Sequence, residues 1–168
     1  KEICTQKITS LSTEEFEAFE HAFFTELTYN SNAIEGNSLS LEETQHLINE
    51  GLVPEGKNLR EINETKNHLQ AIHYINAYKG DVNEQFILKL HAIILKNISQ
   101  HFAGKYRQTS VRIFGSDAHF PESFFVPQLM KNLIYWYKHH KKSLHPFALA
   151  IILSARLVSI HPFIDGNG

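Results

Sequence analysis

The sequence has little of several features that mark specialised classes of protein. Cys4 is the only cysteine among 168 residues, so a disulfide framework is excluded and a reducing compartment suits the chain. The formal net charge of -2 gives no basic footprint for non-specific nucleic-acid binding. The longest apolar run, 146–160, is too short to span a bilayer and contains Arg156. We therefore expect a cytoplasmic protein with no membrane or nucleic-acid partner evident in this chain.

The remaining composition is that of an ordinary globular protein. Hydrophobic residues make up 42% and charged residues 20% of a chain long enough for one core and a small extension. The 11 histidines are scattered, and none stands beside cysteines at a zinc spacing.

Signals of α-helix dominate the first half of the chain. Two capping boxes, in which a serine and a glutamate satisfy each other's free backbone amides, predict helix starts at Ser12–Glu15 and Ser40–Glu43. The first helix carries apolar residues at three- and four-residue spacing, which form one face of an amphipathic helix: Phe16, Phe19, Phe23 and Leu27. A long helix is predicted over about 58–79.

Three further helices are predicted in the second half. Asp81 can cap a helix that runs to about residue 98. Pro127 and Pro146 each suit the first turn of a helix, because that turn needs no amide from its first residues. The helix that begins at Pro146 is apolar on all sides, so we expect it to be the buried central helix.

One segment departs from the helical pattern. The residues "SVRIF" alternate in polarity, Gly115, Ser116 and Asp117 are turn formers, and a proline closes the segment. This pattern predicts a short β-hairpin. The expected fold class is therefore all-α with one small hairpin.

The last ten residues, "SIHPFIDGNG", combine groups suited to phosphate chemistry. His161 is a candidate base and Asp165 a hard oxygen ligand of the kind that Mg²⁺ takes beside substrate phosphates. The glycines around Asn167 allow backbone amides to approach an anion. A lone "DGNG" would favour a simple turn, but the whole string after an apolar helix favours phosphoryl or nucleotidyl transfer.

The string "HPFIDGNG" resembles the signature of the Fic family, His-Pro-Phe-x-(Asp/Glu)-Gly-Asn-Gly followed by arginine. The segments "GKNLREINETKNHLQAI" and "AGKYRQTSVRIFG" and the helix at 127–136 are similar to the family as well. The resemblance implies an all-α, Fic-like helical bundle with a β-hairpin flap. It divides the chain into an N-terminal helical extension, 1–80, and a Fic core, 81–168.

The resemblance also implies roles for individual residues. His161 corresponds to the general base, and Asp165 to the ligand of a Mg²⁺ that bridges the phosphates of ATP. The anion hole corresponds to the backbone amides of three consecutive residues: Gly166, Asn167 and Gly168. The flap that docks the target as an added strand corresponds to Val111, Arg112 and Ile113. The implied reaction is transfer of AMP from ATP to a hydroxyl side chain of a target protein, which can include the enzyme itself.

A second family pattern, (Ser/Thr)-x-x-x-Glu-(Gly/Asn), is matched by Ser31, Glu35 and Gly36. In relatives that carry this inhibitory helix, the glutamate pairs with the motif arginine and keeps the γ-phosphate from a productive position. The resemblance thus implies auto-inhibition by Glu35. The competing interpretation is a plain helix end with Gly36 as its stop.

One departure from the family pattern leaves other functions open. The motif arginine would follow Gly168, so we expect the chain to be truncated and inactive as it stands. Removal of AMP, or transfer of another phosphate-containing group, would use the same site. A catalytically silent interaction module is the alternative outside enzymology, and a homodimer is left open.

Overall fold

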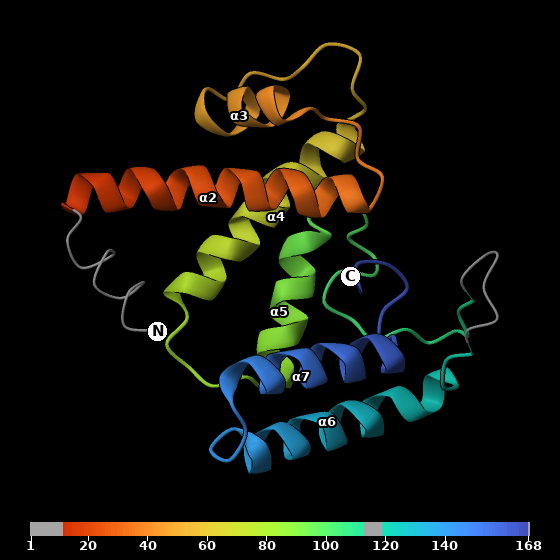
Figure 1. Cartoon of the computed structure of the whole chain (residues 1–168). Helices are drawn as coiled ribbons and strands as arrows, with labels where there is room; N and C mark the ends of the chain where they lie inside the picture. Colours follow the sequence, from red (N-terminus) through yellow and green to blue (C-terminus); the bar gives the residue numbers. More distant parts are fainter. Residues whose placement is uncertain (1–11, 113–118, 168) are drawn as a thin grey trace. The chain divides into compact units, whose positions relative to one another are not determined.

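The computed structural model describes residues 12–112 and 119–167 (Figure 1). Its helices are α2 (Thr13–Ile34), α3 (Leu41–Asn49), α4 (Leu59–Ala77), α5 (Glu84–Ile94), the 3₁₀ turn η1 (Ser123–Phe125), α6 (Val126–His140) and α7 (Pro146–Ile160). Within these two ranges no β-strand occurs, which confirms the all-helical class. None of the described helices is both long and apolar enough to pass through a membrane. The chain forms two compact units, Lys1–Ile75 and Asn76–Gly168.

The helix starts of the first unit follow the predicted capping boxes. At α2 the Glu15 amide donates to Ser12 Oγ (3.2 Å), and the Ser12 amide donates to Glu15 Oε2 (2.8 Å). At α3 the same pair of bonds joins Ser40 and Glu43, at 3.1 and 2.7 Å. Each box satisfies two amides that a helix start would otherwise leave without a partner, so both predictions are confirmed.

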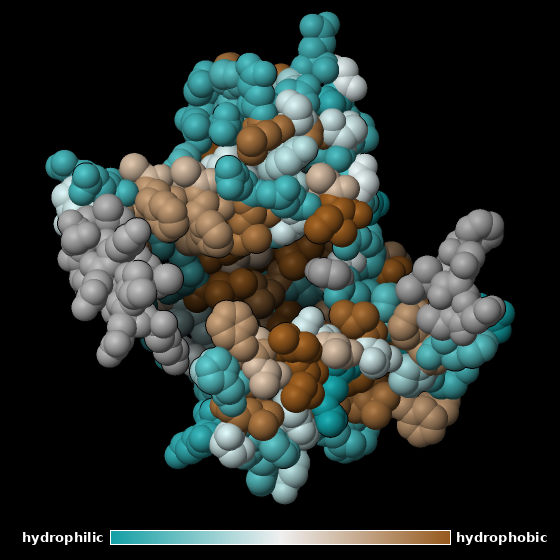
Figure 2. Space-filling model, viewed as in Figure 1, coloured by the Kyte–Doolittle hydropathy of each residue, from teal (hydrophilic) through white to brown (hydrophobic). Residues whose placement is uncertain are grey.

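The packing of the first unit differs from the predicted apolar face of α2. Figure 1 shows α2 and α3 side by side, and the buried cluster of this unit is Leu39, Leu47 and Ile62. On α2 the buried residues are Thr25 and Thr28, and the predicted apolar face remains exposed, as the tan and brown side chains over α2 in Figure 2 indicate. The spacing of apolar residues predicts which side chains share one face of a helix. It does not predict which face of that helix packs against the rest of the unit.

In the second unit, α5 begins later than predicted. Asn83 is its N-cap and accepts the Phe86 amide on Oδ1 at 2.9 Å. Asp81, the predicted cap, instead accepts the Tyr137 hydroxyl (2.7 Å) and pairs with Lys141. The expected cap was wrong because these partners at the end of α6 occupy the Asp81 carboxylate.

Helices α6 and α7 lie antiparallel beside one another (Figure 1) and share the core of the second unit. That core is Val126, Met130, Leu133 and Ile160, and both prolines open their helices as predicted. The prediction that α7 is buried on all sides was wrong. Phe147 is 76% and Ile151 66% exposed, and brown side chains gather over α7 in Figure 2.

The predicted β-hairpin is not found in the described part of the chain. Val111 and Arg112 adopt no strand, and Ile113 lies outside the described residues. Side chains rather than a strand ladder connect the two ends of this segment. Ser110 Oγ donates to the Glu122 carboxylate (2.7 Å), and Ser123 Oγ donates to the Gln108 carbonyl (3.0 Å).

Candidate active site

The end of α7 places His161 in a rare backbone conformation. His161 is the C-cap, with φ 49° and ψ 62°, and its amide donates to the Leu157 carbonyl at 3.0 Å. Pro162 follows at once and cannot continue the helix, because it has no amide hydrogen. A left-handed conformation costs a residue with a Cβ about 1–2 kcal/mol, so other contacts must hold His161 there.

Arg107 provides those contacts. Its amide donates to the Pro162 carbonyl (2.9 Å), and its Nε donates to the His161 carbonyl (2.7 Å). Its remaining guanidinium nitrogens donate to the carbonyls of Thr109 (3.0 Å) and Pro121. The side chain is 3% exposed, and burial lowers its pKa while the Glu122 carboxylate opposes that shift. Arg107 therefore connects the loop at 161–167 to both ends of the 108–122 segment.

His91 of α5 contacts the loop at 161–167 from its buried side. Its Nδ1 accepts the Gly104 amide (2.9 Å), which leaves the ring proton on Nε2 to be donated to the Asp165 carbonyl (2.9 Å). The imidazole also stacks on Phe163, with ring centroids 3.7 Å apart and planes at 6°. Burial lowers the pKa of His91, with a smaller opposing contribution from the Asp165 carbonyl.

The side chains of the loop close it on itself. Asn167 Oδ1 accepts the Phe163 amide (2.9 Å), and its Nδ2 donates to the Phe163 carbonyl (3.0 Å). The Gly166 amide donates to Asp165 Oδ1 at 2.8 Å. Gly168 lies outside the described residues. Of the three amides predicted for the anion hole, the one on Gly166 thus already meets an anionic oxygen.

The His161 ring is held as a neutral base would need to be. Phe120 stacks on it, with centroids 4.1 Å apart, and Nδ1 is buried without a hydrogen-bond partner. Burial lowers the pKa of His161 below 6.5, and the charge of Arg107 lowers it further. The Val158 carbonyl partly opposes these shifts, although it makes no regular hydrogen bond with Nδ1. A base must be unprotonated to accept a proton, so this environment favours the active form at neutral pH.

A comparison with family models matches residues 81–168 to the Fic/DOC family, just over half of the chain. The chain belongs to the Fic/DOC family. Among curated relatives, the "Protein adenylyltransferase Fic" of Drosophila virilis is 33% identical over 155 residues, 90% of this chain and 31% of the relative. The Fic chain thus spans about a third of the length of such relatives.

Solved structures agree with the family assignment. A "Fic domain containing signaling protein" from Bacteroides thetaiotaomicron superposes with a TM-score of 0.86 at 28% identity, covering 96% of this chain and 64% of that one. "Fic-1" from C. elegans superposes with a TM-score of 0.79 at 30% identity, covering 87% and 44%. The helical Fic fold predicted from the motif is therefore confirmed.

The donor set of the Fic loop fits a magnesium ion that is held jointly with a substrate. No three His, Cys, Asp or Glu side chains come together as a metal site in residues 12–112 and 119–167. Asp165 is the carboxylate that the loop itself supplies. Mg²⁺ is commonly bound by one or two carboxylates together with phosphates and water, so one carboxylate is sufficient in a nucleotide site.

The segment predicted as an inhibitory helix ends in a well-formed stop. The Gly36 amide donates to the Ala33 carbonyl (3.1 Å) and the Asn37 amide to the Asn32 carbonyl (3.0 Å), the two bonds of a Schellman motif. Glu35 is the C-cap and is exposed. Gly36 thus ends the helix as a glycine at this position commonly does, and the Glu35 carboxylate remains exposed to solvent.

Asn37 fixes this turn to α4. Its Nδ2 donates to the Glu61 carbonyl (3.1 Å) and to the Glu64 carboxylate (3.2 Å), and its Oδ1 accepts the Leu39 amide (3.1 Å). Ser31 lies in the last turn of α2. The pattern that singled out Ser31, Glu35 and Gly36 did not include Asn37, although asparagine side chains in turns often bond the backbone two residues on.

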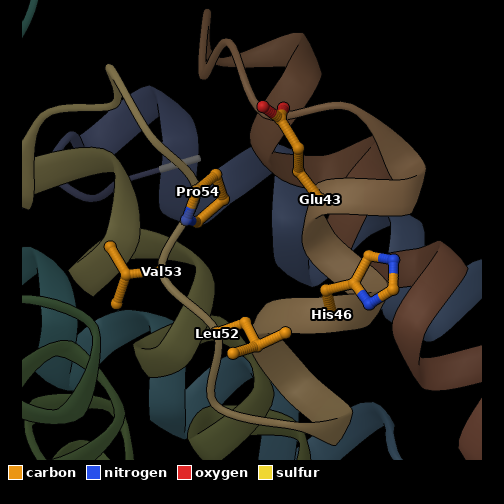
Figure 3. A pocket seen from close by; sticks show the side chains of 5 residues that line it. All are labelled: Glu43, His46, Leu52, Val53 and Pro54. Atoms are coloured by element: carbon orange, nitrogen blue, oxygen red, sulfur yellow. The ribbon is translucent and has the colours of Figure 1, made fainter.

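The first unit contains a shallow pocket of about 240 Å³ that does not suit a nucleotide. Figure 3 shows its lining, which comprises Glu43 and His46 on α3 and the segment Leu52–Pro54 that follows this helix. His46 is paired with Glu50, Nδ1 to Oε1 at 2.9 Å, and Lys57 is paired with Glu43 at 3.2 Å. The Lys57 ammonium near this pocket is already matched by a carboxylate, so phosphates would gain little there.

Sequence reasoning missed His91, Phe120 and the structural role of Asn167. The available signal for His91 was a polar residue inside the apolar helical run "FILKLHAII", since a buried imidazole needs partners. Phe120 has no comparable local signal. Phe120 belongs to the site because it stacks on the ring of His161, which lies 41 positions further along the chain.

Proposed function

We propose that this protein transfers AMP from ATP to a hydroxyl side chain of a target protein, which can be the enzyme itself. The observation that carries the proposal is His161, a histidine with a lowered pKa held at a strained helix end directly before the glycine-containing loop of the family motif. The names of the relatives, protein adenylyltransferases, support AMP as the transferred group. Strained conformations of this kind are kept where the side chain serves a function.

In this reaction the target hydroxyl oxygen attacks the α-phosphorus of ATP. The bond from that phosphorus to the bridging oxygen breaks, pyrophosphate leaves, and the hydroxyl proton moves to His161. The buried Nδ1 leaves Nε2 as the nitrogen that accepts this proton. The amides of Gly166, Asn167 and Gly168 would bind phosphate oxygens, and the bond from the Gly166 amide to a carboxylate oxygen supports that role. Asp165 would hold Mg²⁺, which supplies neutralisation of phosphate charge when bound.

Glu35 is proposed to restrain this activity. Its carboxylate stands exposed at a turn that two backbone hydrogen bonds and the Asn37 side chain keep in place. A carboxylate presented on a fixed turn can compete with a phosphate for a cationic partner. The motif arginine of the family would be that partner.

The proposal is tested with the product of the complete coding sequence and ATP labelled at either the α- or the γ-phosphorus. Over a matched lysate without the added protein, the protein should add label from α-labelled ATP and none from γ-labelled ATP. Asp165→Asn should reduce labelling strongly and remove its dependence on magnesium, because the substitution neutralises the carboxylate. Labelling from the γ-phosphorus, or unchanged magnesium dependence in the variant, would contradict the proposal.

A further inference from the structure

His91 contacts the loop at three neighbouring positions from one ring. Its face lies on Phe163, its Nε2 donates to the Asp165 carbonyl, and its edge lies against Gly166. A Cβ added at Gly166 would come within 3.4 Å of the ring carbon Cδ2, and Gly166 has φ +71°. The ring is 2% exposed and both nitrogens are engaged, so His91 binds neither phosphate nor metal directly.

The bond to the Asp165 carbonyl has a consequence for the next amide. A trans peptide directs its carbonyl and its amide hydrogen to opposite sides of one rigid plane. Since His91 draws the Asp165 carbonyl toward the core, the Gly166 amide of the same peptide is turned away from the core. The amide indeed meets an anionic oxygen, Asp165 Oδ1, at 2.8 Å.

We propose that His91 is a positioning residue, which holds the Asp165–Gly166 peptide so that its amide faces the phosphates of the bound nucleotide. The Gly104 amide sets the tautomer for this task, because its bond to Nδ1 requires the ring proton to be on Nε2. This inference rests on the proposed function only in taking a nucleotide phosphate as the anion.

Two substitutions separate the hydrogen bonds of His91 from its packing. His91→Phe keeps a ring on Phe163 but removes the donor to the Asp165 carbonyl and the acceptor of the Gly104 amide. His91→Gln loses the stacking but retains one donor and one acceptor. The matched control is His68→Phe, because His68 is a partly buried histidine of the first unit with one ring bond, from Nδ1 to Thr28 Oγ1 at 3.1 Å.

Calorimetry on the complete gene product measures the binding of Mg·ATP and of inorganic pyrophosphate. The melting temperature of each variant is measured as a second readout. We expect His91→Phe to bind both probes about tenfold more weakly, the scale of one hydrogen bond to a charged group. His91→Gln should bind within about threefold of the wild type. His68→Phe should lower the melting temperature and leave binding unchanged.

A spectroscopic readout follows the amide itself. In ¹⁵N-labelled protein, pyrophosphate should shift the Gly166 amide resonance of the wild type and of His91→Gln, but much less that of His91→Phe. If His91→Phe does not fold, His91→Asn takes its place, because its shorter amide cannot reach both partners. Wild-type binding in a folded His91→Phe or His91→Asn variant would overturn the proposal, as would unfolding of all three variants. Absence of AMP transfer in both the wild type and Glu35→Gly would instead contradict the proposed function, since pyrophosphate binding does not depend on transfer.

Discussion

Helices α2 and α7 both end in a left-handed residue, but they use different residues for it. At α2 the residue is Gly36, with φ 91° and nothing within 4 Å of the position a Cβ would take. At α7 it is His161, with φ 49°. Glycine adopts this conformation without steric cost, whereas a histidine is strained by about 1–2 kcal/mol.

The two ends are also held differently. The turn after α2 is closed by local backbone bonds and is anchored to α4 by the Asn37 side chain and by the Ser38 amide, which donates to Glu61 Oε1 at 2.8 Å. The turn after α7 depends on two buried residues that are distant in the sequence. Arg107 bonds the His161 carbonyl, 54 positions further along, and His91 bonds the Asp165 carbonyl, 74 positions further along. A strained residue therefore persists where its side chain is needed and where the surrounding structure fixes it.

The largest expected effect comes from replacing His161 by alanine or glycine. Both variants should lose AMP transfer by about 10²- to 10⁴-fold, the usual contribution of a general base, while nucleotide binding stays nearly intact. His161→Gly should be more stable than His161→Ala by about 1 kcal/mol, because glycine relieves the left-handed strain. Transfer rates and urea unfolding measure the two effects. Comparable turnover in either variant would reject His161 as the base.

Removal of the Arg107 guanidinium should loosen the α7 end. Arg107→Met leaves the His161, Thr109 and Pro121 carbonyls without donors, so we expect about 2–4 kcal/mol lower free energy of unfolding. The control is Arg156→Met. Arg156 is exposed and lies over the Trp136 ring at 4.6 Å, which is worth about 0.5–1 kcal/mol. Equal losses in the two variants, measured by urea unfolding, would show that the carbonyl bonds add little.

The contrast between local and distant partners also explains what could be predicted from the sequence. Ser12, Ser40, Pro127 and Pro146 were predicted correctly because a cap or a first turn depends on residues within a few positions. The motif residues were found because they stand together in eight positions of sequence. The exposed faces of α2 and α7, by contrast, depend on which surfaces their units cover. The bonds of His91 require knowledge of the fold before any partner can be named.

Replacing Gly36 should have a smaller effect than the loss of Arg107. Gly36→Ala introduces left-handed strain of about 1–2 kcal/mol but no clash, since the surrounding space is open. The matched control is Ala33→Gly in the last turn of α2, which costs about 1 kcal/mol through helix propensity alone. Urea unfolding should show both losses. No loss in Gly36→Ala would mean that the turn shifts readily to another conformation.

The smallest expected effect is a shift in the pH profile of transfer. Because burial lowers the pKa of His161, the acid limb of the rate should lie below pH 6.5, and the rate should fall only as the ring becomes protonated. Phe120→Leu uncovers part of the ring and should move this limb back toward 6.5. A limb above 6.5 in the wild type would contradict the environment described for His161.

The most direct test of the account is intact-mass spectrometry of the complete gene product after incubation with ATP and magnesium. Four proteins are compared at equal folded concentration: the wild type, Glu35→Gly, Glu35→Gly with His161→Ala, and Glu26→Gly, which removes another exposed carboxylate of α2. Glu26→Gly should lose about 1 kcal/mol of stability because it lies inside α2, and Glu35→Gly should lose less because it lies at the C-cap. We predict that Glu35→Gly gains AMP on its own chain beyond the wild type, that Glu26→Gly does not, and that the double variant gains none. Equal or lower AMP addition in Glu35→Gly than in the wild type would contradict it.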